Sequence, residues 1–440
     1  MPSLTQVATA MQHVLTTVAD EAARTSGCVR RPRVFTGASL VQTLVFGCLG
    51  TPLPSLDNLA QTAAALGVPV TPQAIDQRFT RATADCLQAV LAAAVGTVIA
   101  AAPVAIPLLQ RFAGVYVIDS TTLALPPALA EVWPGCGNGA QPTAAALKLG
   151  VGLDLKCGGL LGPLPEAGRT HDRATAVAAA PLPVDALRLT DLGFWRLDDL
   201  QTLADGGGFW LSRLHAQAVV FDATGTRRLV GELLAAQGTD EVDLPVTLGV
   251  RHRLPARLLA RRVPPEVAAV RRRRLRAEAK RRGQRLGRAR LALADWALFV
   301  TNVPAARLSL AEALVLARAR WQIELLFKLW KSEGRLDEGR SAQPWRVLGE
   351  TYAKLIAMVL QHWTLLVGCW AWPDRSWPKA AQTIRQHALL LALALRSHRR
   401  LRTALATLRD CLAAGGRLNP RQAKPNTYQL LLAVEDGGLT

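Results

Sequence analysis

The most informative helix of this sequence is Ala317-Arg-Ala-Arg-Trp-Gln-Ile-Glu-Leu-Leu-Phe-Lys-Leu-Trp-Lys331. Neither Gly nor Pro occurs between Ala305 and Glu333, and Ser309 with Glu312 three residues later has the pattern of a capping box at a helix start. We therefore predict a helix with an apolar side that packs and a charged stripe that faces outward. At about 100° per residue the stripe holds Arg320, Glu324, Lys328 and Lys331, and the apolar side holds Ile323, Leu326, Leu329 and Trp330.

The charged stripe has two interpretations. It can be a surface feature in which Glu324 forms i,i+4 ion pairs with Arg320 and Lys328, each worth about 0.2–0.5 kcal/mol. It can also belong to a site in which the carboxylate binds a cation and the neighbouring cations bind phosphate. The helix alone favours the surface interpretation. The rest of the chain favours a site, because it supplies two aspartates in suitable settings.

Two short predicted strands each lead to an aspartate. The β-branched run Val115-Tyr-Val-Ile ends in Asp119 and then in hydroxyl residues, the pattern of a buried strand with an acid at its exit. The run Ala186-Leu-Arg-Leu-Thr leads in the same way to Asp191. Ligand sites of open α/β sheets gather at strand ends. Each aspartate alone is more typical of a turn or a helix cap, but two of them with a helical glutamate indicate a shared site.

Further strands are predicted around this pair, with a helical connection over 174–179. The neighbouring strands are predicted at Leu147–Leu155, from Leu160, at Phe209–Leu214 and at Trp296–Asn302, and an insertion contributes Ala218–Phe221, Arg228–Leu234 and Val242–Val250.

A basic block follows the insertion strands and runs from Arg251 to Arg290. It holds sixteen Lys and Arg residues against Glu266 and Glu278, and so supplies most of the chain's net charge of +19. A solvated charged helix is the usual interpretation of such a run. Here nearly all the charge has one sign, which is unfavourable unless a polyanion neutralises it. We predict contact with the phosphate backbone of nucleic acid, with Arg271, Arg272, Arg273 and Arg274 as DNA-binding residues.

Composition sets wider limits. A chain of 440 residues accommodates two or three domains with a large core. Its seven cysteines are scattered without a CxxC pair, which argues against a zinc site or a disulfide scaffold and fits a reducing cytosol. The start of the chain lacks the pattern of a signal peptide. An uncharged run from Leu87 to Gln110 contains Pro103 and Pro107, so we interpret it as a buried core helix rather than a membrane span.

The two ends of the chain are predicted to be helical. Near the N-terminus, Ser55–Val68 and Thr71–Phe79 form two short helices with Thr71 as N-cap and Pro72 in the first turn. This layout fits a DNA-binding helix-turn-helix and an ordinary helical hairpin equally well. Helices are predicted C-terminally at Val347–Trp370, Ala380–Leu395 and Arg399–Ala413. We interpret His362 and His387 in these apolar helices as core residues rather than ligands. In the helix-turn-helix interpretation the second helix would offer Gln73, Gln77, Arg78 and Arg81.

Three motifs together resemble DDE transposases of the insertion-sequence-four family: Asp119-Ser-Thr, Asp191-Leu-Gly-Phe-Trp and Arg320-Trp-Gln-Ile-Glu324 with Lys331. The helix signature of that family is Tyr, two residues, Arg, three residues, Glu, six residues, Lys. Arg320, Glu324 and Lys331 keep these spacings, whereas Ala317 stands in the Tyr position and lacks the hydroxyl that would contact DNA. The resemblance extends from about Phe35 into the C-terminal helices, and the Arg-Glu-Lys helix is its most specific part.

The resemblance implies an α/β fold, with an RNase H-like mixed-sheet catalytic core that carries a β-rich insertion between helical regions. We expect four parts: a helical N-terminal region that can bind DNA (1–110), the catalytic core (111–216 and 291–340), the β-rich and basic insertion (217–290) and a helical C-terminal region (341–440). A sheet core interrupted by an insertion is consistent with the long gap between Asp191 and Glu324.

The resemblance also implies the chemistry. Cutting a phosphodiester requires an activated water or 3′-hydroxyl and a stabilised leaving oxygen, and two Mg²⁺ or Mn²⁺ ions supply both when carboxylates hold them about 3.5–4 Å apart. Asp119 would bridge the two ions, and Asp191 and Glu324 would each hold one. The three carboxylates are thus expected to converge. Arg320, Lys328 and Lys331 would bind the phosphates beside the scissile bond.

The expected function is cut-and-paste transposition of an insertion sequence, by DNA cleavage and strand transfer. Two alternatives stay open: an RNase H-like nuclease that cuts without joining, and an inactive DNA-binding relic of a transposase. The expected partner is double-stranded DNA, both the element ends and the target, bound by a homodimer. No membrane association is expected, and the expected location is the bacterial cytoplasm at the nucleoid.

Overall fold

The computed structural model describes residues 3–31, 33–136, 144–215, 218–283, 285–370, 372, 374–418 and 425–434. The chain forms two compact units, each assembled from separate segments. The first unit comprises Met1–Ala105, Ile118–Val177 and Trp321–Tyr428, and the second comprises Ile106–Val117, Ala178–Arg320 and Gln429–Thr440. Residues 1–2 and 435–440, which the predicted N- and C-terminal helical regions include, lie outside the described residues.

The N-terminal part of the first unit is helical, as predicted. Hydroxyl side chains cap the starts of these helices: Thr36 accepts the Ser39 N–H, Ser55 accepts the Asn58 N–H and Thr80 accepts the Thr83 N–H. The elements are α1 (Leu4–His13), a π-helical turn η1 (Val14–Val18), α2 (Ala19–Ser26), α3 (Gly37–Gly50), α4 (Leu56–Ala65), α5 (Pro72–Asp76) and α6 (Arg81–Gly96). The predicted core helix over 87–110 is therefore helical only to Gly96, and α7 (Pro107–Gln110) belongs to the second unit.

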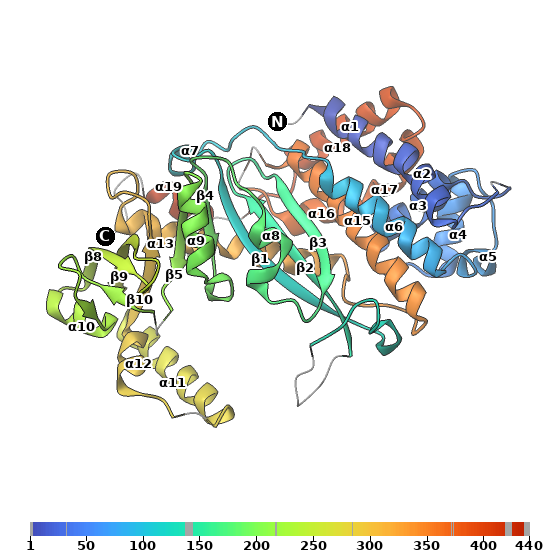
Figure 1. Cartoon of the computed structure of the whole chain (residues 1–440). Coiled ribbons are helices and arrows are strands. Elements are labelled where there is room, and N and C mark those ends of the chain that lie inside the picture. Colours follow the sequence, from blue (N-terminus) through green and yellow to red (C-terminus); the bar gives the residue numbers. More distant parts are fainter. Residues whose placement is uncertain are drawn as a thin grey trace. The chain divides into compact units, whose positions relative to one another are not determined.

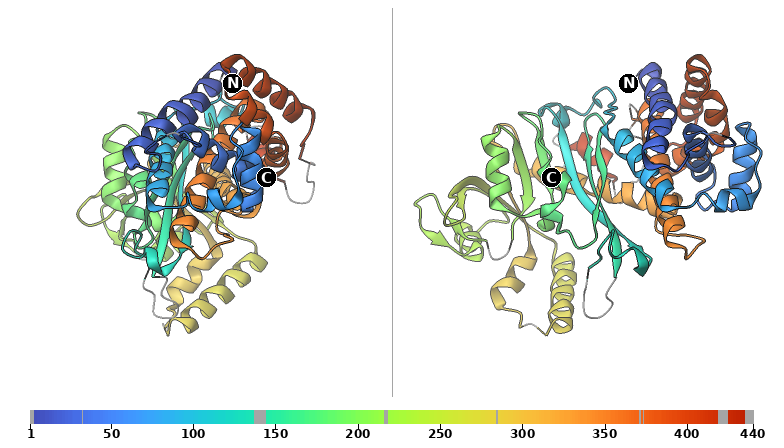
Figure 2. Two further views of the ribbon diagram at one scale, coloured as in Figure 1. Left: turned by 90° about the vertical axis from the view of Figure 1, so that its right-hand side faces the viewer. Right: turned by 45° about the vertical axis from the view of Figure 1, so that its right-hand side comes forward.

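The C-terminal helices complete the first unit around one long buried helix, α15 (Pro344–Gly368). Every residue of α15 from Leu348 to Gly368 is buried. It packs against α3 and α6, and Figures 1 and 2 show these helices side by side. The other elements are α16 (Trp377–Gln386), α17 (Ala388–Ala394), α18 (His398–Ala414) and α19 (Thr427–Ala433), of which α19 begins in the first unit and ends in the second.

The first unit also holds strands. Strand β1 (Val115–Leu125) begins in the second unit and continues in the first, where the strand order is β3-β2-β1. Strand β2 (Ala145–Asp154) is buried along its whole length and pairs antiparallel with β3 (Leu160–Ala167), and both strands form where they were predicted. The turn between them contains Gly158, whose φ of +72° favours glycine. The short helix η2 (Pro127–Leu129) lies between β1 and β2, and η3 (Asp172–Ala174) and α8 (Ala176–Ala179) follow β3. Helix α8 begins in the first unit and ends in the second.

The second unit continues from the start of β1 in the order β1-β4-β5-β10-β9-β8-β6-β7. Strands β1, β4 (Leu187–Thr190) and β5 (Phe209–Arg213) are parallel neighbours. Strand β10 (Trp296–Thr301) pairs antiparallel with β5. The pairs that follow in this order, β10-β9, β9-β8, β8-β6 and β6-β7, are antiparallel as well. The remaining elements are η4 (Leu192–Phe194), α9 (Leu197–Asp205), β6 (Val220–Phe221), β7 (Arg227–Arg228), α10 (Val230–Gln237), β8 (Glu241–Leu248), β9 (Leu254–Arg262), α11 (Pro265–Arg281), α12 (Arg288–Ala292), η5 (Leu293–Asp295) and α13 (Leu310–Ala319).

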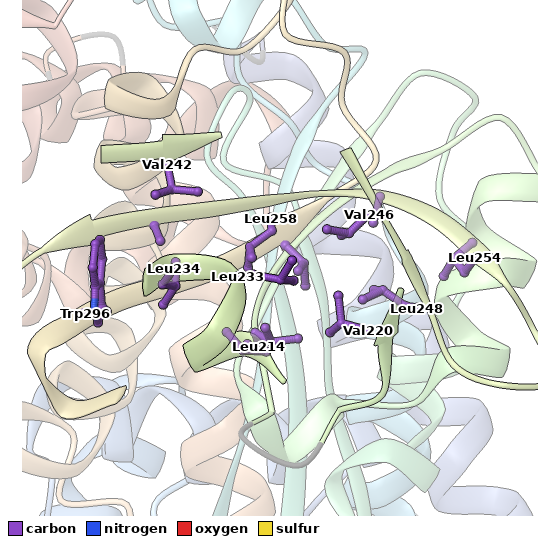
Figure 3. Close-up of a cluster of buried hydrophobic side chains, with 14 of the residues drawn as sticks. Leu214, Val220, Leu233, Leu234, Val242, Val246, Leu248, Leu254, Leu258 and Trp296 are labelled. Atoms are coloured by element: carbon purple, nitrogen blue, oxygen red, sulfur yellow. The ribbon is translucent and has the colours of Figure 1, made fainter. Parts of the chain in front are cut away.

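The insertion in the second unit has its own hydrophobic core (Figure 3). Helix α10 contributes Leu233 and Leu234, and the strands contribute Val246 from β8, Leu258 from β9 and Trp296 from β10. Helix α11 extends away from these strands in Figure 1 and buries only Ala268 and Ala279. The predicted mixed α/β fold with a β-rich insertion is thus confirmed, and the insertion adds its strands next to β10.

One predicted strand of the insertion is wrong. Residues 228–234 form the end of β7 and then helix α10. Val230, Leu233 and Leu234 are buried with helical spacing, the Glu232 carboxylate accepts the Leu229 N–H at the helix start, and Gly238 ends the helix with a φ of +65°. The leucines and valines fit both periods, so the capping residues decide for the helix.

Within the described part of the chain, no helix is long and apolar enough to cross a membrane.

Candidate active site

Asp119 lies in the first unit, half-buried and in the middle of β1 rather than at its exit. The prediction of a strand end is wrong here because the strand continues to Leu125 through Ser120, Thr121 and Thr122, of which the two threonines are β-branched and suit a strand. One carboxylate oxygen, Oδ1, accepts the N–H of Ser120 at 2.8 Å. The Asp119 side chain is therefore oriented by the backbone of the next residue.

Asp191 lies in the second unit directly after β4, as predicted. It caps the short helix η4, and its Oδ1 accepts the Leu192 N–H at 2.7 Å. Its other oxygen, Oδ2, lies 3.8 Å from the guanidinium of Arg320. The structure thus brings together Asp191 and the arginine of the helix signature.

The predicted helix around Glu324 forms in three pieces. Ser309 and Glu312 make the expected capping box at the start of α13, Arg320 ends α13, and α14 (Trp321–Lys328) carries Glu324. The last piece is a π-helical turn, η6 (Leu329–Glu333), which no sequence signal indicated. The predicted apolar side is confirmed, because Ile323, Leu326, Leu329 and Trp330 are buried.

Glu324 and Lys331 belong to the first unit together with Asp119. Glu324 is half-buried, and Lys331 donates from Nζ to the carbonyl of Thr122 in β1 at 3.4 Å. This bond ties the end of the helix signature to the strand of Asp119, three residues beyond it. Lys328 is exposed and Ala317 is half-buried.

The donor set fits a hard divalent cation. Carboxylate oxygens are the ligands that Mg²⁺ and Mn²⁺ prefer, and Asp119 and Asp191 each have one oxygen fixed by a backbone N–H. Among the residues that the structure describes, no group of three His, Cys, Asp or Glu side chains is placed to hold a metal. Convergence of Asp119, Asp191 and Glu324 stays a prediction.

The four arginines predicted to bind DNA differ in their surroundings on α11. Arg271 donates to the Trp296 carbonyl at 2.9 Å, and burial lowers the pKa of its guanidinium. Arg272 forms an ion pair with Asp295. Arg273 and Arg274 are exposed. Arg271 and Arg272 therefore hold α11 against the start of β10, and Arg273 and Arg274 face solvent.

The rest of the basic block is partly neutralised by acids that the sequence places before it. Residues of β9 pair with residues of β8 or its preceding turn: Arg257 with Asp243, Arg261 with Glu241 and Arg262 with Asp240. Beyond α11, Arg285, Arg288 and Arg290 are exposed. Exposed cations thus lie on α11 and after it, whereas the three arginines of β9 form ion pairs next to the sheet.

The two short helices predicted near the N-terminus form as α4 and α5. Helix α5 ends at Asp76, before Gln77, Arg78 and Arg81. Thr71 does cap it and Pro72 does open it, as predicted. The guanidinium of Arg78 lies 5.9 Å from the Phe35 ring centre, and that of Arg81 lies 5.6 Å from that of Trp345. Both contacts lie within the first unit, and the helix-turn-helix stays a prediction.

His362 is a core residue, as predicted. It is buried and lies 2.7 Å from the Gly158 carbonyl, and burial lowers its pKa to about 4. His387 is half-buried, with its Nδ1 2.8 Å from the Thr383 carbonyl. All seven cysteines are free thiols.

Sequence reasoning missed two charged residues near Asp119. Lys148 in β2 is 8% exposed, and it pairs with Asp172, which also accepts a hydrogen bond from Ser120. The one signal was a single lysine inside the otherwise uncharged run Ala145–Leu153.

Comparison with known proteins identifies the class to which this fold and these motifs belong. Residues 110–360 match the transposase DDE domain family, and the chain belongs to that family. The match covers β1, β4 and α14, the elements that carry Asp119, Asp191 and Glu324.

Within the class, similarity extends over nearly the whole chain to transposases of the insertion-sequence-four family, as the motifs indicated. The transposases for insertion sequence elements IS231B and IS231C of Bacillus thuringiensis subsp. berliner are 23% and 25% identical to it, and that for IS231E of subsp. finitimus is 25% identical. Each alignment covers 96% of this chain and 94% of the relative. The function of the chain is transposition of DNA.

Proposed function

We propose that this transposase cuts and joins DNA with Asp119, Asp191 and Glu324 as the ligands of two divalent ions. Asp119 would be shared between the ions, and the other two carboxylates would each hold one. When bound, Mg²⁺ or Mn²⁺ ions activate the attacking oxygen and stabilise the leaving oxygen of an in-line displacement. The similarity to transposases over nearly the full chain favours this function over a nuclease that cannot join ends.

Two contacts in the structure support the proposed ligands. Arg320 lies beside Asp191 in the second unit, and Lys331 bonds to the strand of Asp119 in the first. The cations of the helix signature are thus adjacent to the aspartate motifs and can neutralise phosphates there. Arg320, Lys328 and Lys331 would bind the phosphates on either side of the scissile bond, because guanidinium and ammonium groups recognise phosphate oxygens.

We propose the functional division 1–110, 111–216 with 291–340, 217–290 and 341–440. In this division the core carries the chemistry and the insertion binds DNA through α11. The N-terminal region would contribute further DNA contacts. The protein would act at the nucleoid as a homodimer on the two ends of its element.

Glu324→Gln provides the sharpest test of the site. The substitution keeps side-chain volume and helix propensity but removes the charge that would hold an ion. With Mg²⁺ or Mn²⁺, cleavage of an element-end duplex should fall by about three orders of magnitude or more. DNA affinity should stay level or rise, because a negative charge near phosphate is gone. Gel-based cleavage and strand-transfer assays measure the first effect, and fluorescence anisotropy measures the second.

Two further variants complete the experiment. Glu333→Gln removes a carboxylate from the same helical segment, where Glu333 pairs with Arg385, and should cleave like the parent protein. Lys331→Ala should weaken binding of element ends and keep residual cleavage at saturating protein. Normal cleavage by Glu324→Gln would mean that Glu324 forms ion pairs on the helix and is not a metal ligand. Cleavage without strand transfer by the parent protein would favour the nuclease.

A further inference from the structure

An ion pair between a buried lysine and a half-buried aspartate lies next to the strand that carries Asp119. Lys148 belongs to β2, in which every residue is buried, and its own exposed fraction is 8%. An ammonium group in such surroundings is costly unless it is paired. Its Nζ donates to Oδ1 of Asp172 at 2.8 Å. Lys148 therefore depends on Asp172, which lies 24 residues later on a connecting turn.

Asp172 is held firmly for this role. It opens the short helix η3, and its carbonyl accepts the Thr175 hydroxyl at 2.6 Å. The segment that follows packs onto β2 at Gly150, where an added Cβ would lie only 2.7 Å from Val177. Burial raises the pKa of Asp172, but the hydrogen bonds from Lys148 and Ser120 outweigh it and leave the pKa below its usual value. The carboxylate is thus ionised at neutral pH.

Ser120 connects this pair to Asp119. Its hydroxyl donates to the same Asp172 oxygen at 2.7 Å, and its backbone N–H donates to Asp119 Oδ1 at 2.8 Å. Successive side chains of a strand point to opposite faces. The Lys148–Asp172 pair therefore holds Ser120 on one face of β1, and the backbone of Ser120 orients the Asp119 carboxylate on the other.

We propose that Lys148, Asp172 and Ser120 are positioning residues that fix the Asp119 carboxylate for a divalent cation. The inference rests on the proposed role of Asp119 as a metal ligand. Pairing with Asp172 satisfies the Lys148 ammonium group, so stability alone does not require the further bond from Ser120 to Asp172. Groups that orient metal ligands typically change metal affinity or activity by about 10–100-fold when they are removed.

The test measures Mn²⁺ binding directly, by calorimetric titration of the protein bound to an element-end duplex in which the 3′-hydroxyl is replaced by hydrogen. Ser120→Ala removes only the hydroxyl, and Lys148→Met removes the charge and keeps the length. Both should weaken Mn²⁺ binding by about 10–100-fold and raise the Mn²⁺ concentration for half-maximal cleavage similarly. Ser120→Thr keeps the hydroxyl and should behave like the parent protein.

Lys354→Met is the matched control for loss of a buried lysine. Lys354 is 2% exposed and donates to the carbonyls of Arg335 and Glu338, with no bond to β1. It should lower the melting temperature as Lys148→Met does and leave Mn²⁺ affinity unchanged. Folded Ser120→Ala with parental Mn²⁺ affinity and cleavage would overturn the proposal, even if Lys148→Met failed to fold. A parent protein that binds no Mn²⁺ on DNA would instead overturn the proposed metal site itself.

Discussion

His362 makes the stability of the first unit sensitive to acid. Its pKa is about 4 in the folded protein because the ring is buried, and near 6.5 when the chain is unfolded. Between these values the unfolded chain binds a proton that the folded chain does not. The free energy of unfolding should therefore fall as pH drops from 6.5 to 4, by roughly 3 kcal/mol from this residue.

His362→Gln isolates that contribution. The glutamine amide can still donate to the Gly158 carbonyl and does not titrate. Urea unfolding at pH 7 and at pH 4.5 should show a smaller loss of stability for the variant than for the parent protein. Acids elsewhere titrate equally in both proteins and cancel in the difference. Equal losses would mean that the ring is accessible to protons in the folded state.

At the residue level the sequence supplied three candidate carboxylates but not the residues that contact their strands. Asp119, Asp191 and Glu324 were identifiable because each follows a local pattern, a strand run or a helical spacing. The Lys148–Asp172 pair joins a strand to a turn that is distant in sequence, so no local pattern marks it. Arg271 and Arg272 were grouped with Arg273 and Arg274 for the same reason, because only the folded chain shows their partners near β10.

Helix α11 offers a comparison in which two variants lose the same charge. Arg273→Ala with Arg274→Ala removes two exposed cations, and should weaken binding to any duplex. The dependence of log affinity on log salt should become shallower by about 0.9 for each DNA phosphate that an arginine no longer neutralises. Thermal stability should change little, because both side chains are exposed.

The second double variant replaces the two arginines that hold α11 against the start of β10. Arg271→Ala with Arg272→Ala removes the bonds to Trp296 and Asp295, so it should destabilise the protein by about 1–3 kcal/mol. Its salt dependence should stay closer to that of the parent protein. Anisotropy titrations from 50 to 300 mM salt, together with thermal melts, separate the two outcomes. Equal salt slopes for the two double variants would show that exposure on α11 does not decide DNA contact.

At the element level, segments whose residues favour one type of secondary structure were predictable, even where they are short. The apolar side of the helix signature and strands β2, β4, β5 and β10 follow from periodicity. The predicted strand at 228–234 failed because the three leucines and the valine of this segment fit both periods, and Gly238 and Glu232 supplied the decisive ends of a helix. The π-helical turn η6 had no signal either, since its residues are ordinary helix formers.

The net charge of the whole molecule bears on its assembly. A charge of +19 makes copies repel one another at low salt, and a bound polyanion removes that repulsion. We therefore expect the protein to be monomeric alone and dimeric when bound to element-end DNA. Light scattering after size-exclusion chromatography, at 100 mM salt with and without a duplex, measures the mass. A dimeric mass without DNA, or a complex in which one copy of the protein holds two element ends, would contradict this expectation.

The placement of α15 has a consequence for synthesis of the protein. This helix packs against α3 and α6, which leave the ribosome some 250 residues earlier. Until Pro344–Gly368 is made, the apolar surfaces of α3 and α6 that contact α15 in the folded protein stay exposed. Exposed apolar surface favours aggregation or degradation. A copy of the gene that is cut short by a premature stop codon would therefore yield no stable N-terminal fragment to compete for DNA with the intact enzyme.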